Sequence, residues 1–390
     1  MDSIMEFKGY RRDDGKVGTR NYVGIISTVV CANEVTGKIT SQLSGTALFT
    51  HQQGCCQTPL DIATVTRTLI GLGKNPNLAS VLLVSLGCES VSVDEVAKGI
   101  SEGGKRVEVV VIQESGGASK ATALGTLLAQ EMVGEASKLE RSVCPASDLV
   151  LGLKCGSSDT TSGLSSNPAL GIASDLLVEA GGTSVLGETT EFIGAEHLLA
   201  SRAKNEEVGR EIIALVHRME ERAKSVGVDM RGGQPTAGNI KGGLTSIEEK
   251  SLGAIAKSGH AAIEAVYGYA ISPTVRGLVV MDSPGREPEI LTGLVASGCN
   301  VIGFTTGRGA PQGFPFVPVI KITGNRLTWN RLPEHIDIDV SSIMEGTEPL
   351  LSAGKRIFNE VLEVASGKLT KAEISGYYKA MDIYTVGPVI

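Results

Sequence analysis

The sequence predicts an α/β fold made of two Rossmann-like lobes, each built on a mainly parallel sheet. Short apolar runs alternate with helical segments along most of the 390 residues, which is typical of βαβ units. Hydrophobic residues make up 42% of the chain and aromatic residues only 4%. The cores must therefore be mostly aliphatic, as in strands that are buried on both faces. Glycine is frequent, at 49 residues, which indicates many tight turns or backbone that runs close to a ligand.

The first lobe, residues 1–145, is expected to alternate strands with helices joined by right-handed crossovers. Apolar runs predict strands at 21–32, 47–56 (a short strand running into a loop), 77–90 and 106–117. Helical segments follow at 59–73, 92–104 and 118–139. The helix at 59–73 starts with a proline and ends near a glycine, as helices commonly do.

The pattern pauses at 140–148 and resumes in a second lobe, residues 146–390. Its strands are predicted at 149–159, 184–192, 276–284, 299–307 and 316–324. Its helices are predicted at 167–182, 194–226 and 350–367. The stretch near 230–245 is rich in Gly and contains Pro and Asn, so we expect a loop there.

The charge of the chain argues against several classes of partner. The net charge is -7, which disfavours sequence-independent binding to nucleic acid. No run of 18 or more apolar residues is present, and the first residues lack the apolar core of a signal peptide. We therefore expect a cytoplasmic protein with no membrane segment. Seven cysteines are an odd number, and in a reducing compartment they are expected to be thiols or metal ligands.

Several predicted strands end in reactive or polar side chains followed by glycine-rich turns. These residues are Cys31, Cys88, Glu89, Cys155, Asp159, Glu188, Glu191, Thr305, Thr306 and Arg308. Ligands of open parallel sheets bind beyond the carboxyl ends of the strands, so this set predicts one shared site. Taken singly, a Cys or Thr at a strand end is more often an ordinary core residue. The repetition of the pattern favours the functional interpretation.

The loop "HQQGCCQTPLD" brings His51, Cys55 and Cys56 together. No C-x₂-C pair is present, which disfavours a structural zinc ribbon. A metal site assembled from separate strand ends remains open, with Cys31, Cys55, Cys88 and Cys155 as ligands. Thiolates also hold iron–sulfur clusters, and the same residues would supply three or four of them.

Two further segments suit an anionic ligand. "CGSSDTTSG" precedes a helix start, where backbone N–H groups attract a carboxylate, although Ser158 or Asp159 would equally serve as a helix cap. "FTTGRGAPQGFP" offers Thr305, Thr306 and Arg308 beside glycine backbone. Glu188 sits where a strand should end and is a candidate general base.

These strings together resemble the altronate/galactarate dehydratase family of sugar-acid lyases. The matching segments, in chain order, are "GYRRDDGKVGTRN", "VCAN", "HQQGCC", "LGCES", "LKCGSSDTTSGLSSNPALG", "ETTEFIGAEH", "GNIKGGLTSIEEKSLG", "MDSPG" and "FTTGRGAPQG". The resemblance implies removal of water from a sugar acid such as altronate or galactarate, giving a 2-keto-3-deoxy acid, with Fe²⁺ or Mn²⁺ required. By position, the family's recurring polar residues fall on His51, Cys55, Cys88, Glu89, Cys155, Ser158, Asp159, Glu188, Glu191, Glu196, Asn239, Thr305, Thr306 and Arg308.

Three departures from the family pattern keep other functions open. Members often carry a further small N-terminal domain, so a SAF-like partner subunit of ~90 residues is expected to supply part of the site. The family's G-C-G reads "GCC" here, and its C-G-G-S-D reads "CGSSD", with Ser157 in place of Gly. The large subunit of sulfolactate sulfo-lyase, which releases sulfite and pyruvate, resembles the chain as well. A non-catalytic α/β scaffold subunit that needs a partner is a third hypothesis.

The resemblance also suggests roles for the residues. Cys and His residues would hold a metal that stabilises the developing enolate as a Lewis acid. Glu188 or His51 would take the proton, with Glu191 nearby. Arg308, Thr305, Thr306, Asn239 and the Ser158–Asp159 loop would bind the small anionic hydroxy acid. We also expect the chain to form a homo-oligomer.

Overall fold

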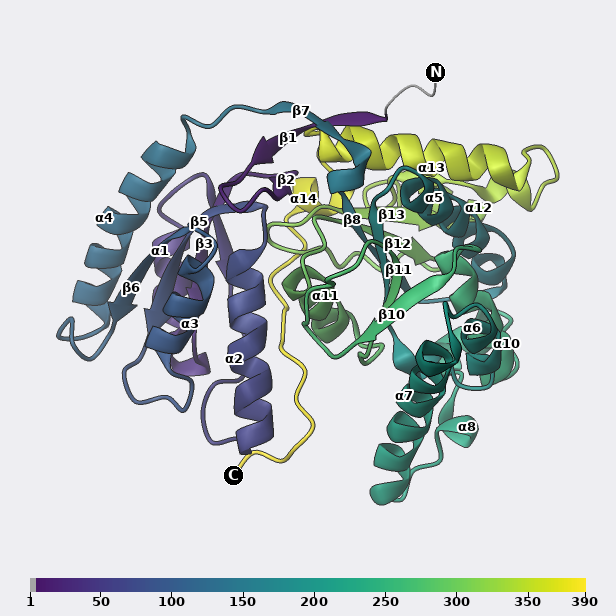
Figure 1. Ribbon diagram of the computed structural model, residues 1–390, viewed down its shortest axis with the longest axis horizontal. Coiled ribbons are helices and arrows are strands. Elements are labelled where there is room, and N and C mark those ends of the chain that lie inside the picture. Colours follow the sequence, from purple (N-terminus) through teal and green to yellow (C-terminus); the bar gives the residue numbers. More distant parts are fainter. Residues whose placement is uncertain (1–4) are drawn as a thin grey trace.

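A four-stranded parallel sheet forms the core of the first lobe in the computed structural model, which describes residues 5–390 (Figure 1). Its strand order is β4 (Thr46–Phe49), β3 (Tyr22–Ser27), β5 (Leu78–Ser85) and β6 (Arg106–Val111). Four helices cover it: α1 (Asn33–Thr40), α2 (Pro59–Lys74), α3 (Val93–Ser101) and α4 (Ala118–Ala136). Since all four strands run parallel, their carboxyl ends and the following loops meet at one edge.

The alternation of side chains along the strands explains how both faces are covered. On β3, Val23 and Ile25 pack against α1 and α4, while Ile26 packs in a different cluster with α2 and α3. Successive residues of a strand point to opposite faces, so an aliphatic run such as "YVGIIS" can bury both. Helix α2 starts where expected, with the Thr58 side chain as its cap and Pro59 in the first turn.

A seven-stranded parallel sheet forms the core of the second lobe. Its order is β10 (Ile263–Tyr267), β11 (Gly277–Met281), β9 (Thr183–Leu186), β8 (Val150–Gly156), β12 (Val301–Thr306), β13 (Val319–Thr323) and β14 (Ile338–Asp339). One face packs against α5 (Asn167–Glu179), α7 (Glu206–Ser225) and α13 (Leu350–Ala365). The other face packs against α11 (Glu287–Ala296). The predicted α/β class, with mainly parallel sheets in two Rossmann-like lobes, is confirmed.

A third, antiparallel sheet lies where the two lobes meet, at the top of Figure 1. It consists of β2 (Val17–Gly18), β1 (Glu6–Arg11) and β7 (Ser142–Pro145). The sequence analysis did not predict it, because β2 has only two residues and neither "EFKGYR" of β1 nor "SVCP" of β7 is an aliphatic run.

The two lobes share one hydrophobic cluster. Leu69 and Leu72 of α2 belong to the same buried group as Leu291 and Leu294 of α11. At Gly71 the contact is so close that a Cβ atom would lie 2.3 Å from the carbonyl oxygen of Ala296. The lobes are therefore packed directly on each other, and the division of the chain at residue 145 stays a prediction; residues 1–4 of that first part lie outside the described range.

Two predicted segments differ from the structure. The helical stretch 194–226 is divided into α6 (Glu196–Ser201) and α7, because the Asn205 side chain caps a new helix by accepting from Val208 N at 3.0 Å. The stretch 230–243, predicted as a loop, contains the short helices α8 (Met230–Gly233) and α9 (Ala237–Lys241). A capping box between Thr236 and Asn239 offsets the poor helix propensity of α9. The remaining helices are α10 (Ile247–Ile255), α12 (Arg326–Arg331) and α14 (Lys371–Ser375).

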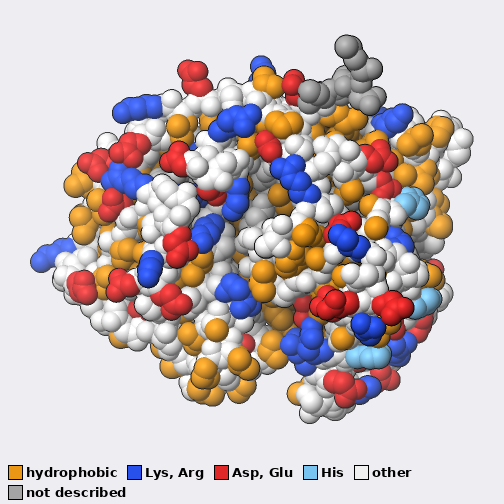
Figure 2. Space-filling view, viewed as in Figure 1, with side chains coloured by type: hydrophobic (Ala, Val, Ile, Leu, Met, Phe, Trp, Pro, Cys, Tyr) orange, Lys and Arg blue, Asp and Glu red, His pale blue; other side chains and the backbone are white. Residues whose placement is uncertain are grey.

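The surface agrees with the composition. Figure 2 shows acidic and basic side chains intermixed over the visible face, without one extended basic region. None of the helices within residues 5–390 combines the length and the apolar character that crossing a bilayer requires.

Candidate active site

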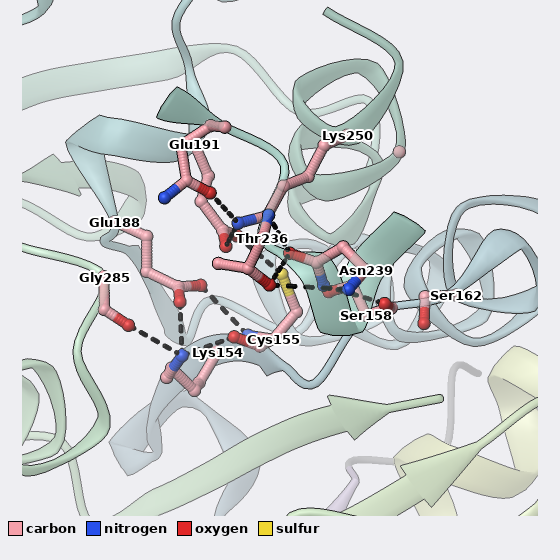
Figure 3. Close-up of polar contacts among 12 residues, drawn as sticks. Lys154, Cys155, Ser158, Ser162, Glu188, Glu191, Thr236, Asn239, Lys250 and Gly285 are labelled. Carbon is pink, nitrogen blue, oxygen red and sulfur yellow. Dashed lines mark hydrogen bonds and ion pairs between the residues drawn. The ribbon is translucent and has the colours of Figure 1, made fainter. Parts of the chain in front are cut away.

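A cluster of buried charged side chains lies at the carboxyl ends of β8 and β9 (Figure 3). Lys154 and Cys155 come from the end of β8, and Glu188 and Glu191 follow β9. Lys250 on α10 and Lys257 in the turn after it complete the group. Parallel pairing of β8 with β9 places their ends side by side, which is why residues more than 30 positions apart meet here.

Glu188 is held in a backbone conformation that L-residues rarely adopt. Its φ is 71° and its ψ is 57°, in the left-handed region. The surrounding structure maintains this strain: its N–H donates to Ser283 Oγ at 2.7 Å. Its carboxylate accepts from Lys154 Nζ at 2.5 Å and from the backbone N–H of Cys155 at 2.9 Å. The carboxylate is thus fixed at the floor of the site.

Lys257 contacts three other members of the cluster. Its Nζ atom lies 3.0 Å from Glu188 Oε2, 3.8 Å from Glu191 Oε2 and 3.3 Å from Cys155 Sγ. The side chain is fully buried. Burial alone would lower the pKa of Lys257, but the carboxylates of Glu188 and Glu191 outweigh burial and raise it, so the group stays an ammonium.

Glu191 is the carboxylate of the cluster that reaches a cavity. Burial raises its pKa, but the ammonium groups of Lys250 and Lys257 lower it more, to about 2. The thiol of Cys155 donates to Glu191 Oε2 at 2.8 Å, and burial raises the pKa of this thiol well above its ordinary range. Cys155 is therefore protonated at neutral pH, and Glu191 is ionised.

The cluster and the cavity wall together carry one more positive than negative charge. Lys154, Lys250, Lys257 and Arg286 face a neutral thiol and three carboxylates, those of Glu188, Glu191 and Glu287. A cavity of about 440 Å³ opens above them, and Lys154, Lys250 and Arg286 contribute to its wall. Its further lining residues are Cys155, Gly156, Ser157, Ser158, Thr190, Glu191, Met230, Gln234, Thr236, Asn239, Ile247, Gly285 and Glu287. A polar cavity of this size with excess positive charge suits a small organic anion.

One wall of the cavity is held by Asn239 of α9. Its Nδ2 donates to the carbonyl oxygen of Ser158 at 2.9 Å, and its Oδ1 accepts from Thr236. Asn239 thereby ties α9 to the loop after β8. Both predicted residues, Ser158 and Asn239, line the cavity.

Cys155, Glu188 and Glu191 are also grouped closely enough to hold a metal ion. One ligand atom from each lies within 4.8 Å of the others, and iron and manganese bind donor sets that contain thiolate and carboxylate groups. In this structure, however, the ammonium of Lys257 contacts all three side chains. The Lys257 ammonium occupies the position that a bound metal cation would take.

Other predicted residues lie beside the cavity but are engaged in structural contacts. Asp159 accepts from Ser162 N and from Asn325 Nδ2, at 3.1 and 2.7 Å. Thr305 Oγ1 hydrogen-bonds to Asn167, and Thr306 Oγ1 accepts from the N–H groups of Gly309 and Ala310. Arg308 donates to the carbonyl oxygen of Gly238 at 2.7 Å and so supports α9.

His51 is placed in the first lobe, and it does not line this cavity. Its ring is buried, with Nε2 bonded to the carbonyl oxygen of Ser27 at 2.9 Å and Nδ1 accepting from Gln53 N at 3.1 Å. Burial lowers its pKa to about 4. A neutral ring with both nitrogens engaged holds its own loop together.

The remaining predicted ligands are also separate from Cys155. Cys31, Cys55, Cys88 and Glu89 lie in loops at the carboxyl edge of the four-stranded sheet. Of the pair Glu196 and His197, neither contributes to the cavity wall formed by the described residues. The structure therefore divides the predicted site into two places.

The three lysines were missed by the sequence analysis. Lys154 and Lys257 are fully buried, and Lys250 is partly buried. The one available signal was a lysine inside the apolar run "LVLGLKCG", because a charged residue in a doubly buried strand requires a partner.

The two residue changes among the three departures from the family pattern, Cys56 and Ser157, fall at strained positions. Cys56 has φ 53° and Ser157 has φ 49°, where glycine would be unstrained. The family's usual glycines at these two places are explained by this backbone conformation.

Comparison with known proteins identifies the family. A family model described as "D-galactarate/Altronate dehydratase, C-terminal" matches residues 146–389, and one described as "D-galactarate dehydratase/Altronate hydrolase, second domain" matches residues 9–137. The (2R)-sulfolactate sulfo-lyase subunit beta of Chromohalobacter salexigens is 40% identical, over 95% of each chain. The galactarate dehydratase (L-threo-forming) of Escherichia coli is 35% identical over 98% of this chain and 77% of its own length. The altronate dehydratase of Bacillus subtilis is 32% identical over 98% of this chain and 78% of its own.

A parallel α/β fold with a buried, positively charged acid–base cluster defines an enzyme site for a small anion. The chain belongs to the D-galactarate/altronate dehydratase family, whose members named above are all lyases.

Proposed function

We propose that this lyase eliminates water from a sugar acid such as altronate or galactarate and forms a 2-keto-3-deoxy acid. The observation that carries the proposal is the buried cluster of Lys154, Glu188, Glu191 and Lys257 beneath a cavity with excess positive charge. The family relationship supports a dehydratase, because two of the relatives named above carry that name.

The charges of the cavity suit the demands of the reaction. A base removes the proton from the carbon next to the carboxylate, and the electron pair delocalises onto the carboxylate. As the C–O bond of the next carbon breaks, this pair forms the carbon–carbon double bond, and the departing hydroxyl group takes up the proton removed in the first step and leaves as water. The resulting enol tautomerises to the keto acid. The intermediate carries additional negative charge on the carboxylate. The ammonium groups of Lys154 and Lys250, aided by Arg286, are positioned to bind and stabilise this charge.

Glu191 is the carboxylate proposed to accept the proton. It lines the cavity and is ionised, whereas Glu188 is fully buried behind it and does not line the cavity. Glu188 is proposed to hold Lys154 and Lys257 in place. The predicted role of His51 as a base is not carried into this proposal, because both of its ring nitrogens are engaged.

The sequence resemblance implies Fe²⁺ or Mn²⁺ as cofactor, and the second-lobe cluster does not fit such an ion as it stands. A divalent ion among Cys155, Glu188 and Glu191 would occupy the space of the Lys257 ammonium and lie close to two further lysines. Repulsion between unit charges a few ångströms apart in a buried site amounts to several kcal/mol. No step of the proposed reaction passes through a metal at this cluster.

A second candidate is the release of sulfite from sulfolactate. The match to the sulfo-lyase subunit covers 95% of both chains, while the galactarate and altronate dehydratases named above extend well beyond the matched region. The name "subunit beta" also implies another subunit in that enzyme. We therefore propose that a small partner subunit takes part in either reaction, within an assembly that contains several copies of this chain.

One experiment distinguishes these candidates. The purified chain, alone and with a co-expressed small partner subunit, is incubated with altronate, galactarate or sulfolactate, and the products are assayed as 2-keto acid and sulfite. A 2-keto-3-deoxy acid from a sugar acid supports the first proposal, and sulfite from sulfolactate supports the second. Neither product in any combination would contradict both.

The role of Glu191 is tested by the Glu191→Gln variant. Loss of a general base typically lowers kcat by ~10²–10⁴-fold. The control is Glu248→Gln, an exposed residue paired with Arg231 at the surface, which should leave kcat unchanged. Native turnover in Glu191→Gln would remove this residue as the proton acceptor.

A further inference from the structure

Three loops at the carboxyl edge of the four-stranded sheet each carry at least one cysteine. Cys31 follows β3, Cys55 and Cys56 follow β4, and Cys88 follows β5. Four of the seven cysteines of the chain are therefore gathered at one edge, although the loops are separated by up to 57 residues. The proposed reaction makes no use of any of them.

The three loops are tied to one another in pairs. Val30 N donates to Gln53 O at 3.0 Å, and Ser90 N donates to Gly54 O at 3.1 Å. Thr28 Oγ1 donates to Glu89 Oε1 at 2.7 Å and so joins the loop after β3 to the loop after β5. Each of these contacts lies within three residues of a cysteine, so the thiols are held near one another.

The loop after β4, which carries Cys55 and Cys56, is packed tightly against the loop after β3. Gly54 has φ 110°, and a Cβ atom there would lie 2.5 Å from the carbonyl oxygen of Thr28. Cys55 Sγ is 3.6 Å from Cys56 Sγ and 4.0 Å from Ser90 Oγ, so the partly buried Cys55 thiol lies against the loop of Cys88.

The position in the sheet is one where parallel α/β folds bind ligands. In the order β4-β3-β5-β6, the chain moves outward in opposite directions from β3, so the switch point lies between β3 and β5. Ligands bind in the crevice outside the carboxyl ends of the strands at such a point. Cys31 and Cys88 follow the two strands that flank it. Both are exposed to solvent.

The spacing of these thiols is wider than a single ion requires. Thiolates bonded to one metal ion at ~2.3 Å lie about 4 Å apart. In the part of the chain that the structure describes, the one group of three possible ligands within 4.8 Å is that of Cys155, Glu188 and Glu191. A wider set of thiols suits a polynuclear cluster, in which each thiolate binds its own iron atom.

We propose that Cys31, Cys55 and Cys88 hold an iron–sulfur cluster at the carboxyl edge of the four-stranded sheet. Three cysteines leave one iron atom of a four-iron cluster without a protein thiolate. The site is distinct from the lysine-filled group around Cys155, and the proposal does not depend on the lyase activity proposed above.

The test is anaerobic reconstitution of the full chain with ferrous iron and sulfide. Iron, acid-labile sulfide and visible absorption are then measured for the wild type and for the variants Cys31→Ser, Cys55→Ser and Cys88→Ser. We expect stoichiometric iron and sulfide in the wild type and at least a tenfold loss in each variant. Cys155→Ser and Cys299→Ser are the controls, and both should retain the cluster. Circular dichroism verifies that every variant is folded.

Several outcomes would overturn the proposal. These are iron without labile sulfide, equal iron in all variants as expected of adventitious binding, or loss of the cluster in Cys155→Ser.

Alkylation of the native protein provides a second measurement that needs no variant. Peptide mass spectrometry should show Cys31, Cys55 and Cys88 protected after reconstitution and modified before it. Modification of all three in the reconstituted protein would contradict the assignment. Because none of these measurements involves turnover, their failure is separate from failure of the proposed reaction.

Discussion

The Nζ atom of Lys257 lies 3.0 Å from Glu188 Oε2, and neither side chain has any surface exposed to solvent. A buried ion pair of this kind is costly to assemble and far more costly to break, because removing one partner leaves a charge without compensation. The pair also contacts Glu191 and Cys155, so it connects every group at the floor of the cavity. The stability of the site and its proton chemistry therefore depend on the same lysine.

Replacing this lysine should destabilise the fold. Lys257→Met is expected to lower the free energy of unfolding by about 3–5 kcal/mol, because Glu188 and Glu191 are left with too little positive charge. Urea denaturation followed by circular dichroism measures the change. The exposed Lys224 provides the control, since Lys224→Met should cost less than ~1 kcal/mol. A Lys257→Met change as small as that of the control would contradict the assigned burial of the pair.

The acid stability of the protein should depend on Glu191. The folded-state pKa of this carboxyl is lowered from its ordinary value of 4.5 to about 2, so the unfolded chain binds the proton more readily. Its contribution to stability is fully present above pH ~4.5 and is lost as the pH falls towards 2. The contribution is roughly 3 kcal/mol, at 1.36 kcal/mol for each pKa unit.

The pH dependence is measured by comparing the wild type with Glu191→Gln. Between pH 5 and pH 3, the free energy of unfolding of the wild type should fall by ~1–2 kcal/mol more than that of the variant. The difference between the two proteins isolates Glu191 from the other carboxylates. Parallel curves would show that the lysines do not lower this pKa.

The contact between the lobes should not tolerate a methyl group at Gly71. A Cβ atom there would lie 2.3 Å from the backbone oxygen of Ala296, so the two helices must move apart. We expect Gly71→Ala to cost about 1–3 kcal/mol in thermal or urea unfolding. Gly37 of α1 is the matched control, because nothing lies within 4 Å of its Cβ position. Gly37→Ala should stabilise the helix by roughly 0.5–1 kcal/mol. Equal effects at the two glycines would argue against the packing of α2 on α11.

Replacing the strained Ser157 by glycine should stabilise the protein. Its φ of 49° is unfavourable for any residue with a Cβ atom. Ser157→Gly is expected to raise the free energy of unfolding by about 1 kcal/mol. Ser157 lines the cavity, so a rise in KM for the substrate with unchanged stability would instead show that its hydroxyl group binds substrate and that strain is negligible.

The sequence alone was sufficient for the parallel α/β class and for the expectation that functional residues follow the strands. Aliphatic runs such as those of β3 and β8 require burial on both faces, and this local requirement is visible in the residues themselves. The family was also evident from ordered segments along the whole chain. The strands β1, β2 and β7 escaped prediction because none contains an aliphatic run: β1 reads "EFKGYR", β7 reads "SVCP", and β2 has only two residues.

Only the tertiary structure decided which strand ends meet. Cys31, Cys55, Cys56 and Cys88 follow strands of the four-stranded sheet, whereas Cys155 lies at the end of β8 in the seven-stranded sheet. The lysines of the site could not be identified in advance, because a lysine in an apolar run shows only that it needs a partner. The partner is set by the pairing of β8 with β9 and by the packing of α10, which bring Lys154, Lys250 and Lys257 to two glutamates. The sequence specifies which groups require compensation, and long-range packing determines which charges supply it.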